Sequence, residues 1–453
     1  MPNALLIQGG RIIDPSQGID LVGNLFISES KIVLVGGETA QPQTPEGCLT
    51  LSAHGLIVSP GFIDLHCHLR EPGFEDKETI ATGTRAAAKG GFTTICCMPN
   101  TEPPIDTQST VEYVMKAARE AGVVRVLPIG CVTKGRRGQE LAEMGELAQA
   151  GVVGFSDDGS PVADSRLMCH ALEYSRAFGL PVMDHCEDLA LSEGGAMNEG
   201  WVATRLGLPG MPAVAEEIMV ARDLALAELT GARLHIAHVS TAGAVELIRR
   251  AKQQGVSVTA EVTPHHLTMT DEWVMGRKGS ESLGSINYDT NAKVNPPLRT
   301  PRDLQALREG LRDGTIDAIA TDHAPHTSVD KLCEFGLAAF GISGMETALG
   351  SLLALVHSGE LELSLLISKL TTEPAKIIRR SGLPADLGTL KIGAPGDITI
   401  FNPNLDWEVN PDVFLSKGKN TPLAGCVLKG KVIATVVGGE VAYKDEAMKI
   451  DRA

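Results

Sequence analysis

Aromatic side chains, basic charge and long apolar runs are all scarce in this chain of 453 residues. Aromatic residues make up 4% of the sequence, and the net charge at pH 7 is −16. This acidic balance argues against nucleic acid or an anionic membrane surface as a partner. It leaves an anionic small substrate open, because a few arginines and a metal ion can dominate the field inside a pocket. No apolar run reaches the length of about 20 residues that a membrane-spanning helix requires.

The cysteines lack any recognisable pattern. There are nine of them, an odd number, and the adjacent pair Cys96 and Cys97 does not form a Cys-x-x-Cys motif. We therefore expect a reduced protein with buried thiols and no disulfide framework. The stretch Met1–Ile7 has neither a basic flank nor a long apolar core, so we expect no signal peptide and a cytoplasmic location.

From Leu56 onward, short apolar segments alternate with amphipathic stretches, as in repeated strand–helix units. Helices are expected over 79–89, 108–121 and 213–229. The eight expected strands cover residues 62–65, 93–97, 124–129, 152–156, 182–184, 234–237, 256–262 and 316–320. This α/β pattern favours a closed (β/α)₈ barrel of the TIM type. The alternative is an open doubly wound sheet, which a Gly-rich phosphate loop after the first strand would favour, and none is present.

Strand-like sequence without helices stands at both ends of the chain. Residues 5–7 are expected to turn at Gly9-Gly10 into a second short strand, and residues 24–36 to form a hairpin. Residues 427–443 are expected to form another hairpin. We predict that residues 1–57 and 386–453 build one small composite β domain beside a barrel of residues 58–385.

The first expected barrel strand ends in the sequence His66-Cys67-His68. Alternate side chains of a strand share a face, so His66 and His68 point the same way and Cys67 points the other way. Two imidazoles on one face at the end of a strand form half of a metal site. A pair of surface histidines is the alternative, since so short a motif also occurs by chance.

Four later segments place further polar residues at the ends of expected strands. After strands four, five, six and eight come Asp157-Asp158, His185, His238, and Asp322 with His326. Barrel active sites are built at this end of the strands, which favours a metal-dependent hydrolase. Zinc binds imidazole nitrogen and carboxylate oxygen, and two metals that share a carboxylate polarise a carbonyl and supply a nucleophile. Asp322 is placed to accept a proton from the attacking water and return it to the leaving nitrogen.

At these residues the chain resembles the amidohydrolase superfamily and, within it, the bacterial type I dihydroorotases. The resemblance rests on residues 66–73, 98–101, 156–161, 185–188, 238–241, 295–299 and 321–326. It implies one or two zinc ions per subunit. His66, His68 and Asp322 would hold the first, His185 and His238 the second, and Asp158 would bridge them.

The bridging position departs from much of the superfamily. Many relatives use a carboxylated lysine there, but no lysine lies between Gly151 and Gly159, and the type I group uses an aspartate. The alternation of side chains lets only one of Asp157 and Asp158 face the site. The match to the family favours Asp158.

The resemblance also implies the substrate contacts and the reaction. Arg70, Asn100 and His326 would hold a substrate carboxylate, with His68 beside them, and Asn295 and the backbone of Phe340 and Gly341 would contact the ring. The implied reaction is the reversible cyclisation of N-carbamoyl-L-aspartate to L-dihydroorotate and water, in pyrimidine (UMP) synthesis. Arg70 suits this role, because a guanidinium binds a carboxylate through two hydrogen bonds. It would share the face of His68 if the strand continues.

The remaining histidines and the cysteines near these motifs are expected to be structural. This applies to His235, His265, His266 and His323, and to the thiols of Cys67, Cys96, Cys97 and Cys186, which nothing in the sequence activates. Residues 325–341, which follow the eighth strand, are the expected mobile loop.

Two other functions stay open. One is a hydantoinase or allantoinase, against which the missing lysine counts. The other is a non-catalytic dihydroorotase-like subunit of aspartate carbamoyltransferase, which would lack metal ligands, whereas all six positions are filled here. The resemblance implies a homodimer as the usual assembly and leaves an association with aspartate carbamoyltransferase open.

Overall fold

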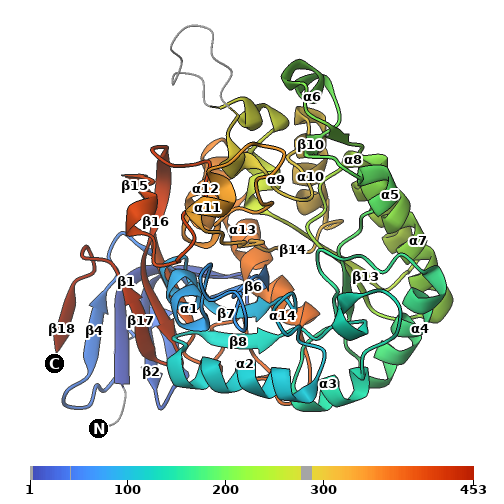
Figure 1. Cartoon of the computed structure of the whole chain (residues 1–453). Coiled ribbons are helices and arrows are strands. Elements are labelled where there is room, and N and C mark those ends of the chain that lie inside the picture. Colours follow the sequence, from blue (N-terminus) through green and yellow to red (C-terminus); the bar gives the residue numbers. More distant parts are fainter. Residues whose placement is uncertain (1–3, 41, 277–287, 453) are drawn as a thin grey trace, which may run out of the picture.

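The computed structural model describes residues 4–40, 42–276 and 288–452, and places a β-sheet beside a barrel of strands and helices (Figure 1). Two parallel sheets, ordered β6-β7-β8 and β14-β13-β12-β9, form the barrel wall. The barrel strands are β6 (Phe62–Cys67), β7 (Phe92–Cys97), β8 (Arg125–Pro128), β9 (Val182–Asp184), β12 (Leu234–Ile236), β13 (Val258–Val262) and β14 (Ala318–Ile319). This confirms the predicted fold class.

Single bridging residues close the barrel at its two seams. Phe155 pairs with Gly130 on one side and Val182 on the other, and Cys67 pairs with His323 at the second seam. The prediction of a strand over 152–156 is therefore wrong. Gly151 adopts a φ of +119° just before it, and the chain turns into a loop directly after Phe155, so one residue carries the pairing.

Helices cover the outside of the barrel, and three of them begin within one residue of their predicted positions. The longer helices are α1 (Ile80–Lys89), α2 (Gln108–Ala121), α3 (Met144–Ala150), α4 (Ser165–Ser175), α7 (Val214–Thr230), α8 (Ala242–Gln253), α10 (Pro301–Asp313), α12 (Ala348–His357), α13 (Leu363–Leu370) and α14 (Thr372–Ile377). Thr79 starts α1 by accepting the Thr82 N–H at 3.1 Å, while the Thr82 hydroxyl accepts the Thr79 N–H at 3.1 Å. This reciprocal capping box provides hydrogen-bond acceptors for two backbone N–H groups that have no partner within the helix.

Short elements interrupt the loops between these units. They are α5 (Leu189–Ser192), β10 (Met197–Asn198), α6 (Trp201–Leu206), β11 (Gly210–Met211), α9 (Pro264–Thr268), α11 (Ser328–Lys331) and the 3₁₀ turns Lys134–Arg136, Arg176–Phe178, Asp271–Met275, Thr290–Ala292, Met345–Thr347 and Pro411–Val413. Within the described part of the chain, no helix is long and apolar enough to cross a membrane.

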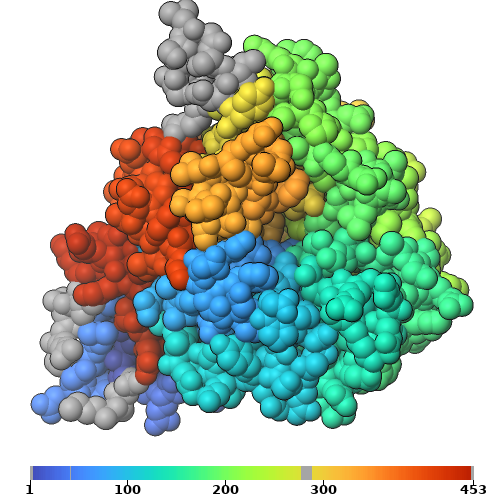
Figure 2. Space-filling view, viewed as in Figure 1, coloured from blue at the N-terminus to red at the C-terminus, as the bar shows by residue number. Residues whose placement is uncertain are grey.

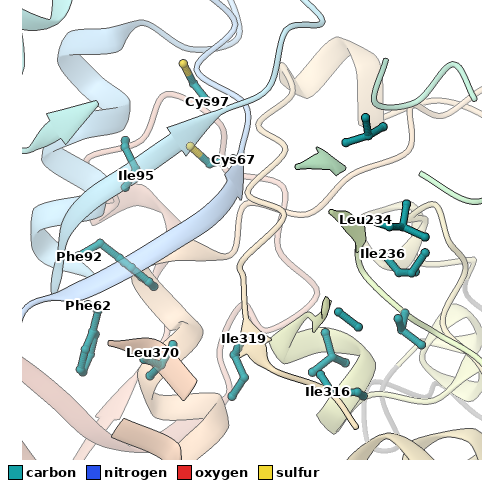
Figure 3. Close-up of a cluster of buried hydrophobic side chains, with 14 of the residues drawn as sticks. Phe62, Cys67, Phe92, Ile95, Cys97, Leu234, Ile236, Ile316, Ile319 and Leu370 are labelled. Carbon is teal, nitrogen blue, oxygen red and sulfur yellow. The ribbon is translucent and has the colours of Figure 1, made fainter. Parts of the chain in front are cut away.

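The barrel strands are buried on both faces, which explains their apolar composition. Phe62 and Phe92 lie in one cluster with Leu370 of α13, and their ring centroids are 5.9 Å apart (Figure 3). Alternate residues, such as Ile63 and Cys96, belong to a second cluster. Apolar packing fills the strand layer, so the polar residues gather where the strands end.

Strands from both chain ends form a single nine-stranded sheet, ordered β17-β16-β15-β5-β1-β2-β3, in which β4 also pairs with β1 and β18 pairs with β4. These strands are β1 (Ala4–Asp14), β2 (Ile19–Ser28), β3 (Lys31–Gly37), β4 (Leu49–Ser52), β5 (Ile57–Pro60), β15 (Ile398–Glu408), β16 (Val427–Val437), β17 (Glu440–Lys444) and β18 (Ile450–Arg452). In Figure 2 the red C-terminal strands lie against the orange surface of the last barrel units, and α12 contacts β16.

Both predicted hairpins of the sheet are present, as β2–β3 and β16–β17. Gly438 and Gly439 connect the second pair with φ values of +55° and +83°, which a two-residue turn of this hand requires. The predicted turn at Gly9-Gly10 is wrong, because β1 runs through it. Gly9, at a φ of +73°, instead forms a bulge where the register with β2 shifts.

Candidate metal centre

The six residues predicted as metal ligands come together at the C-terminal ends of the barrel strands. They are His66 in β6, His68 just beyond it, Asp158 after the bridging residue Phe155, His185 after β9, His238 after β12 and Asp322 after β14. Their exposed fractions lie between 0 and 5%. Chain segments far apart in sequence thus deliver four imidazoles and two carboxylates to one buried place.

His66, His68 and Asp322 form the first set of side chains. Asp322 Oδ1 lies 3.0 Å from His68 Nε2 and 3.6 Å from His66 Nε2. The intervening Cys67 turns away, and its thiol donates to the carbonyl of Cys96. Both imidazoles therefore face the same carboxylate.

His185, His238 and Asp158 form the second set. His185 Nδ1 and His238 Nε2 are 2.8 Å apart, and each lies 3.7 Å from Asp158 Oδ1. The same carboxylate lies 3.3 Å from His66 Nε2, and its Oδ2 lies 3.7 Å from His68 Nε2. Asp158 is thus shared by both sets, as a bridging carboxylate would be.

The donor atoms fit a metal ion. Ligands about 2.0–2.2 Å from a tetrahedral zinc ion are separated from each other by about 3.3–3.6 Å, and the distances given above scatter around that range. His66 Nε2 is buried and has no hydrogen-bond partner among the described residues. Among the six candidate ligands, two triplets have ligand atoms within 4.8 Å of one another, namely His66, Asp158 and His238, and His66, His68 and Asp322.

Both carboxylates of the centre are held in the ionised form that metal ligation requires. Burial alone would raise the pKa of Asp158, but the neighbouring imidazoles hold it well below its usual range. For Asp322, burial again opposes ionisation, and the hydrogen bond with His68 and the charges of His66 and His238 lower its pKa more strongly.

Three of the imidazoles have an oxygen partner on the ring nitrogen that faces away from the cluster. His66 Nδ1 lies 2.8 Å from Glu261 Oε1, His68 Nδ1 lies 2.8 Å from Asn100 Oδ1, and His185 Nε2 lies 2.9 Å from Glu187 Oε2. An acceptor there fixes the proton on that nitrogen and directs the other nitrogen's lone pair to a metal. Neither Glu261 nor Glu187 was predicted to have a role from the sequence. Glu261 could have been identified from the sequence, because it is the one glutamate within the apolar seventh strand.

Three residues of the candidate site have left-handed backbone conformations that non-glycine residues seldom adopt. The φ values are +62° at Arg70, +31° at His238 and +44° at Asp322. Such conformations cost about 1–3 kcal/mol each and cluster at functional sites. They turn the chain sharply as each strand ends, which brings these side chains to the site.

Asp157 and Asp158 point to different surroundings. Asp157 Oδ1 accepts the N–H groups of Val132 and Thr133 at 2.8 and 3.1 Å, and its Oδ2 accepts the Thr133 hydroxyl. Asp157 therefore anchors the loop after β8, while Asp158 faces the imidazoles. Burial raises the pKa of Asp157 to about 6.

Arg70 lies beside the cluster, but for a different reason than expected. Strand β6 ends at Cys67, so no continuing strand carries Arg70 to the face of His68. Instead the left-handed turn at Arg70 sends its guanidinium to Pro325 O and His326 Nε2, each 3.3 Å away. Among the described residues no carboxylate forms an ion pair with Arg70, so its charge is available to a ligand.

The other predicted substrate contacts have partners within the protein. Asn100 Nδ2 donates to Asp158 Oδ2 at 3.1 Å, and Asn295 Nδ2 donates to Glu187 Oε2 at 2.9 Å. His326 Nε2 lies 2.8 Å from Phe340 O, and the Gly341 N–H donates to Lys293 O at 2.9 Å. Burial and the charge of Arg70 lower the pKa of His326 to about 3, so its ring is neutral. The roles of these residues toward a substrate stay predictions.

The remaining histidines and the nearby thiols lie outside the two ligand sets. His235 contacts Thr259 and Glu261, His266 lies between Thr263 and the carbonyl of Pro296, and His323 turns from Asp322 toward Glu78. Burial lowers the pKa of His265 to about 4 and raises the pKa of the Cys97 thiol to about 12.

The segment between β15 and β16 contributes a residue that the sequence analysis did not identify. Asn420 Oδ1 accepts the His326 N–H at 2.9 Å, and Asn420 Nδ2 donates to the carbonyls of Ala324 and Gly341 at 3.0 Å each. Within loop 325–341, the Lys331 ammonium donates to the carbonyls of Thr290, Lys293 and Ala339 at 3.0, 3.1 and 2.7 Å. Both ends and the middle of this loop are therefore tied to other segments.

Two family models and several known proteins match this chain. Residues 55–244 match a family model described as dihydro-orotase-like, and residues 211–443 match one described as amidohydrolase family. Dihydroorotases from Syntrophus aciditrophicus and Pelotomaculum thermopropionicum are each 52% identical over 98% of this chain and 100% of their own length. The dihydroorotase from Anaeromyxobacter dehalogenans strain 2CP-1 is 50% identical over 100% of both chains.

Solved structures show the same architecture. The L-hydantoinase (dihydropyrimidinase) from Arthrobacter aurescens superposes with a TM-score of 0.84 at 26% identity, over 99% of this chain and 98% of that one. A dihydropyrimidinase from Brevibacillus agri superposes with a TM-score of 0.81 at 23% identity, over 98% and 95%. The full-length matches at 50–52% identity decide the assignment, and this chain belongs to the dihydroorotase family of the amidohydrolases.

Proposed function

We propose that the chain is a zinc-dependent dihydroorotase that interconverts N-carbamoyl-L-aspartate and L-dihydroorotate plus water in the cytoplasm. The observation that carries the proposal is the buried centre of four imidazoles and two carboxylates, beside which the Arg70 guanidinium has no carboxylate partner among the described residues. A metal centre suits hydrolysis of a cyclic amide, and a guanidinium suits a ring that bears a carboxylate.

Six residues would hold one or two zinc ions. His66, His68 and Asp322 would take the first, His185 and His238 the second, and Asp158 would bridge them. When bound, such ions polarise a carbonyl and make a strong nucleophile available at neutral pH.

Asp322 carries the proton in the proposed reaction. Its Oδ1 faces His68 and His66, so we assign proton transfer to Oδ2. During hydrolysis a bond forms between the water oxygen and the ring carbonyl carbon, and the bond from that carbon to the ring nitrogen breaks. Asp322 Oδ2 accepts the proton that the water loses and passes it to the leaving nitrogen, and ring closure runs the same steps in reverse.

Arg70 and His326 bind the substrate carboxylate in this proposal. A neutral imidazole next to the guanidinium adds a polar group without adding a second charge. Asn100 would complete this group, while Asn295 and the backbone at Phe340 and Gly341 would meet the ring. A hydantoin without a carboxylate would leave Arg70 unpaired.

The test is the hydrolysis of L-dihydroorotate by the purified chain, followed by ultraviolet absorbance, with zinc measured on the same sample. We expect turnover at an ordinary enzymatic rate, its loss on chelation, and its return on addition of zinc. Turnover of hydantoin or allantoin but not of L-dihydroorotate would contradict the substrate. Full activity in verified metal-free protein would contradict the mechanism.

Arg70→Ala is expected to lower kcat/KM about 10- to 100-fold in both directions, because a charge-assisted hydrogen bond contributes about 1.5–3 kcal/mol. Steady-state kinetics with L-dihydroorotate and N-carbamoyl-L-aspartate measure this. Arg119→Ala, on the exposed face of α2, is the matched control and should behave like the wild type. Unchanged KM and kcat in Arg70→Ala would remove Arg70 from the substrate pocket.

A further inference from the structure

One oxygen of Glu187 joins the candidate metal centre to the predicted ring-contact residue. Glu187 Oε2 lies 2.9 Å from His185 Nε2 and 2.9 Å from Asn295 Nδ2. The Glu187 side chain is 12% exposed, so water competes little for these hydrogen bonds. His185 and Asn295 are 110 positions apart in the sequence, and the single side chain of Glu187 contacts both of them.

At His185, the contact decides which ring nitrogen carries the proton. Because Glu187 accepts a hydrogen bond from Nε2, the lone pair of the neutral imidazole lies on Nδ1. That nitrogen faces Asp158 Oδ1 at 3.7 Å and His238 Nε2 at 2.8 Å. Removing an acceptor of this kind costs about 10- to 100-fold in metal affinity or activity in other proteins.

At Asn295, the contact decides which end of the amide a ligand meets. A carboxylate oxygen can only accept hydrogen bonds, so the amide must turn its Nδ2 toward Glu187. Oδ1 is then the acceptor atom that the amide presents to a ligand. The site then matches a substrate with an N–H donor at this point and disfavours a ring that places a carbonyl there, since two acceptors cannot pair.

We propose that Glu187 is a positioning and specificity residue, which directs His185 Nδ1 to the metal and makes Asn295 an acceptor for a ring N–H of the substrate. The proposal rests on the proposed function, because a cyclic ureide carries the N–H groups from which Asn295 would accept a hydrogen bond. Glu187 itself touches neither the metal nor the substrate, and acts through its two neighbours.

The experiment compares Glu187→Ala, Glu187→Gln, Asn295→Ala and the double variant of Glu187→Ala with Asn295→Ala. Zinc affinity is measured by competition with a chromophoric chelator, and KM and kcat with L-dihydroorotate at saturating zinc. We expect Glu187→Ala to weaken zinc binding about 10- to 100-fold. We also expect it to raise KM about 10-fold, as for the loss of one hydrogen bond of about 1.5 kcal/mol.

The double variant separates positioning from a general structural effect. If Glu187 acts on the substrate through Asn295, adding Glu187→Ala to Asn295→Ala should raise KM by less than about 2-fold, yet still weaken zinc binding. Glu187→Gln keeps an acceptor oxygen and should recover most of both losses. Glu193→Ala, an exposed glutamate in the same loop, is the matched control, and thermal unfolding of each variant checks the fold.

Two results would overturn the proposal. One is zinc affinity and KM in Glu187→Ala within about 2-fold of the wild type, and the other is KM effects of Glu187→Ala and Asn295→Ala that simply multiply. Absence of dihydroorotate turnover in the wild type would overturn the proposed function, and with it the proposed role of Asn295 in recognising the substrate. The zinc competition experiment would then still test whether Glu187 directs His185 Nδ1 to the metal.

Discussion

The Asp322→Asn variant is expected to lose at least about a thousand-fold in kcat while keeping its fold. An asparagine amide cannot take up the proton of the attacking water, and general acid–base catalysis alone contributes about 10²- to 10⁴-fold. The substitution also weakens a ligand that lies 3.0 Å from His68 Nε2 and 3.6 Å from His66 Nε2. Because the two side chains have nearly the same size, the packing around Asp322 should persist. The measurement is kcat with L-dihydroorotate, alongside circular dichroism melting.

Zinc content decides which of the two roles of Asp322 accounts for the loss. A variant that retains zinc and lacks turnover has lost proton transfer, whereas one that lacks zinc has lost a ligand. Asp412→Asn, an exposed aspartate outside the barrel, is the matched control and should keep the wild-type rate. A near-normal rate in Asp322→Asn would show that another group accepts the proton.

The barrel and the positions of the candidate ligands could be predicted because they rest on local periodicity. Two-residue alternation in β6 places His66 and His68 on one side and Cys67 on the other. The closing geometry of a barrel then brings the ends of distant strands together, so residues such as His185 and Asp322 meet although 137 positions separate them. Knowing the strand ends was therefore enough to predict where polar side chains gather, whereas the choice of Asp158 over Asp157 and the division into two ligand sets came from the resemblance to the family.

What the sequence did not predict depends on contacts between distant segments. The partners of the ligands, Glu261 at His66 and Glu187 at His185, are set by tertiary packing, and neither stands in a periodic pattern. Asn420 reaches loop 325–341 from the excursion between β15 and β16, which strand patterning cannot place. Arg70 reaches His326 through a left-handed turn, whereas a longer strand β6 was expected to carry it to the face of His68.

The bulge at Gly9 and the bridging residue Phe155 are a related kind of error. At Gly9 a turn was predicted inside a strand that continues, and over residues 152–156 a strand was predicted where a single residue pairs. Gly9 can adopt a φ of +73° inside a strand that continues, so a glycine pair need not end it. Phe155 is the one residue here that pairs with the two neighbouring sheets, because the polar residues that follow it turn toward the site. Both outcomes are decided by partners that the local sequence does not specify.

The Asp158→Ala variant is expected to lose most of its bound zinc together with turnover, because Asp158 is shared by both sets of candidate ligands. Its carboxylate lies within 3.7 Å of an imidazole nitrogen of His66, His68, His185 and His238. Removing it takes one donor from each ion and leaves the imidazoles without their common anion. An ion that binds only the folded state also stabilises it, so Tm should fall and should no longer respond to added zinc. Elemental analysis and thermal melting with and without zinc measure these changes.

The neighbouring aspartate provides the sharpest control for this prediction. Asp157→Asn keeps an oxygen that can accept the N–H groups of Val132 and Thr133, and burial, which raises the pKa of Asp157 to about 6, makes an uncharged side chain less costly there than at an ordinary aspartate. This variant should retain zinc and most of the activity. Full zinc content in Asp158→Ala, with loss in Asp157→Asn, would move the bridge to Asp157. Such a result would require a rotation of the 156–159 loop on metal binding, since the two carboxylates now face different surroundings.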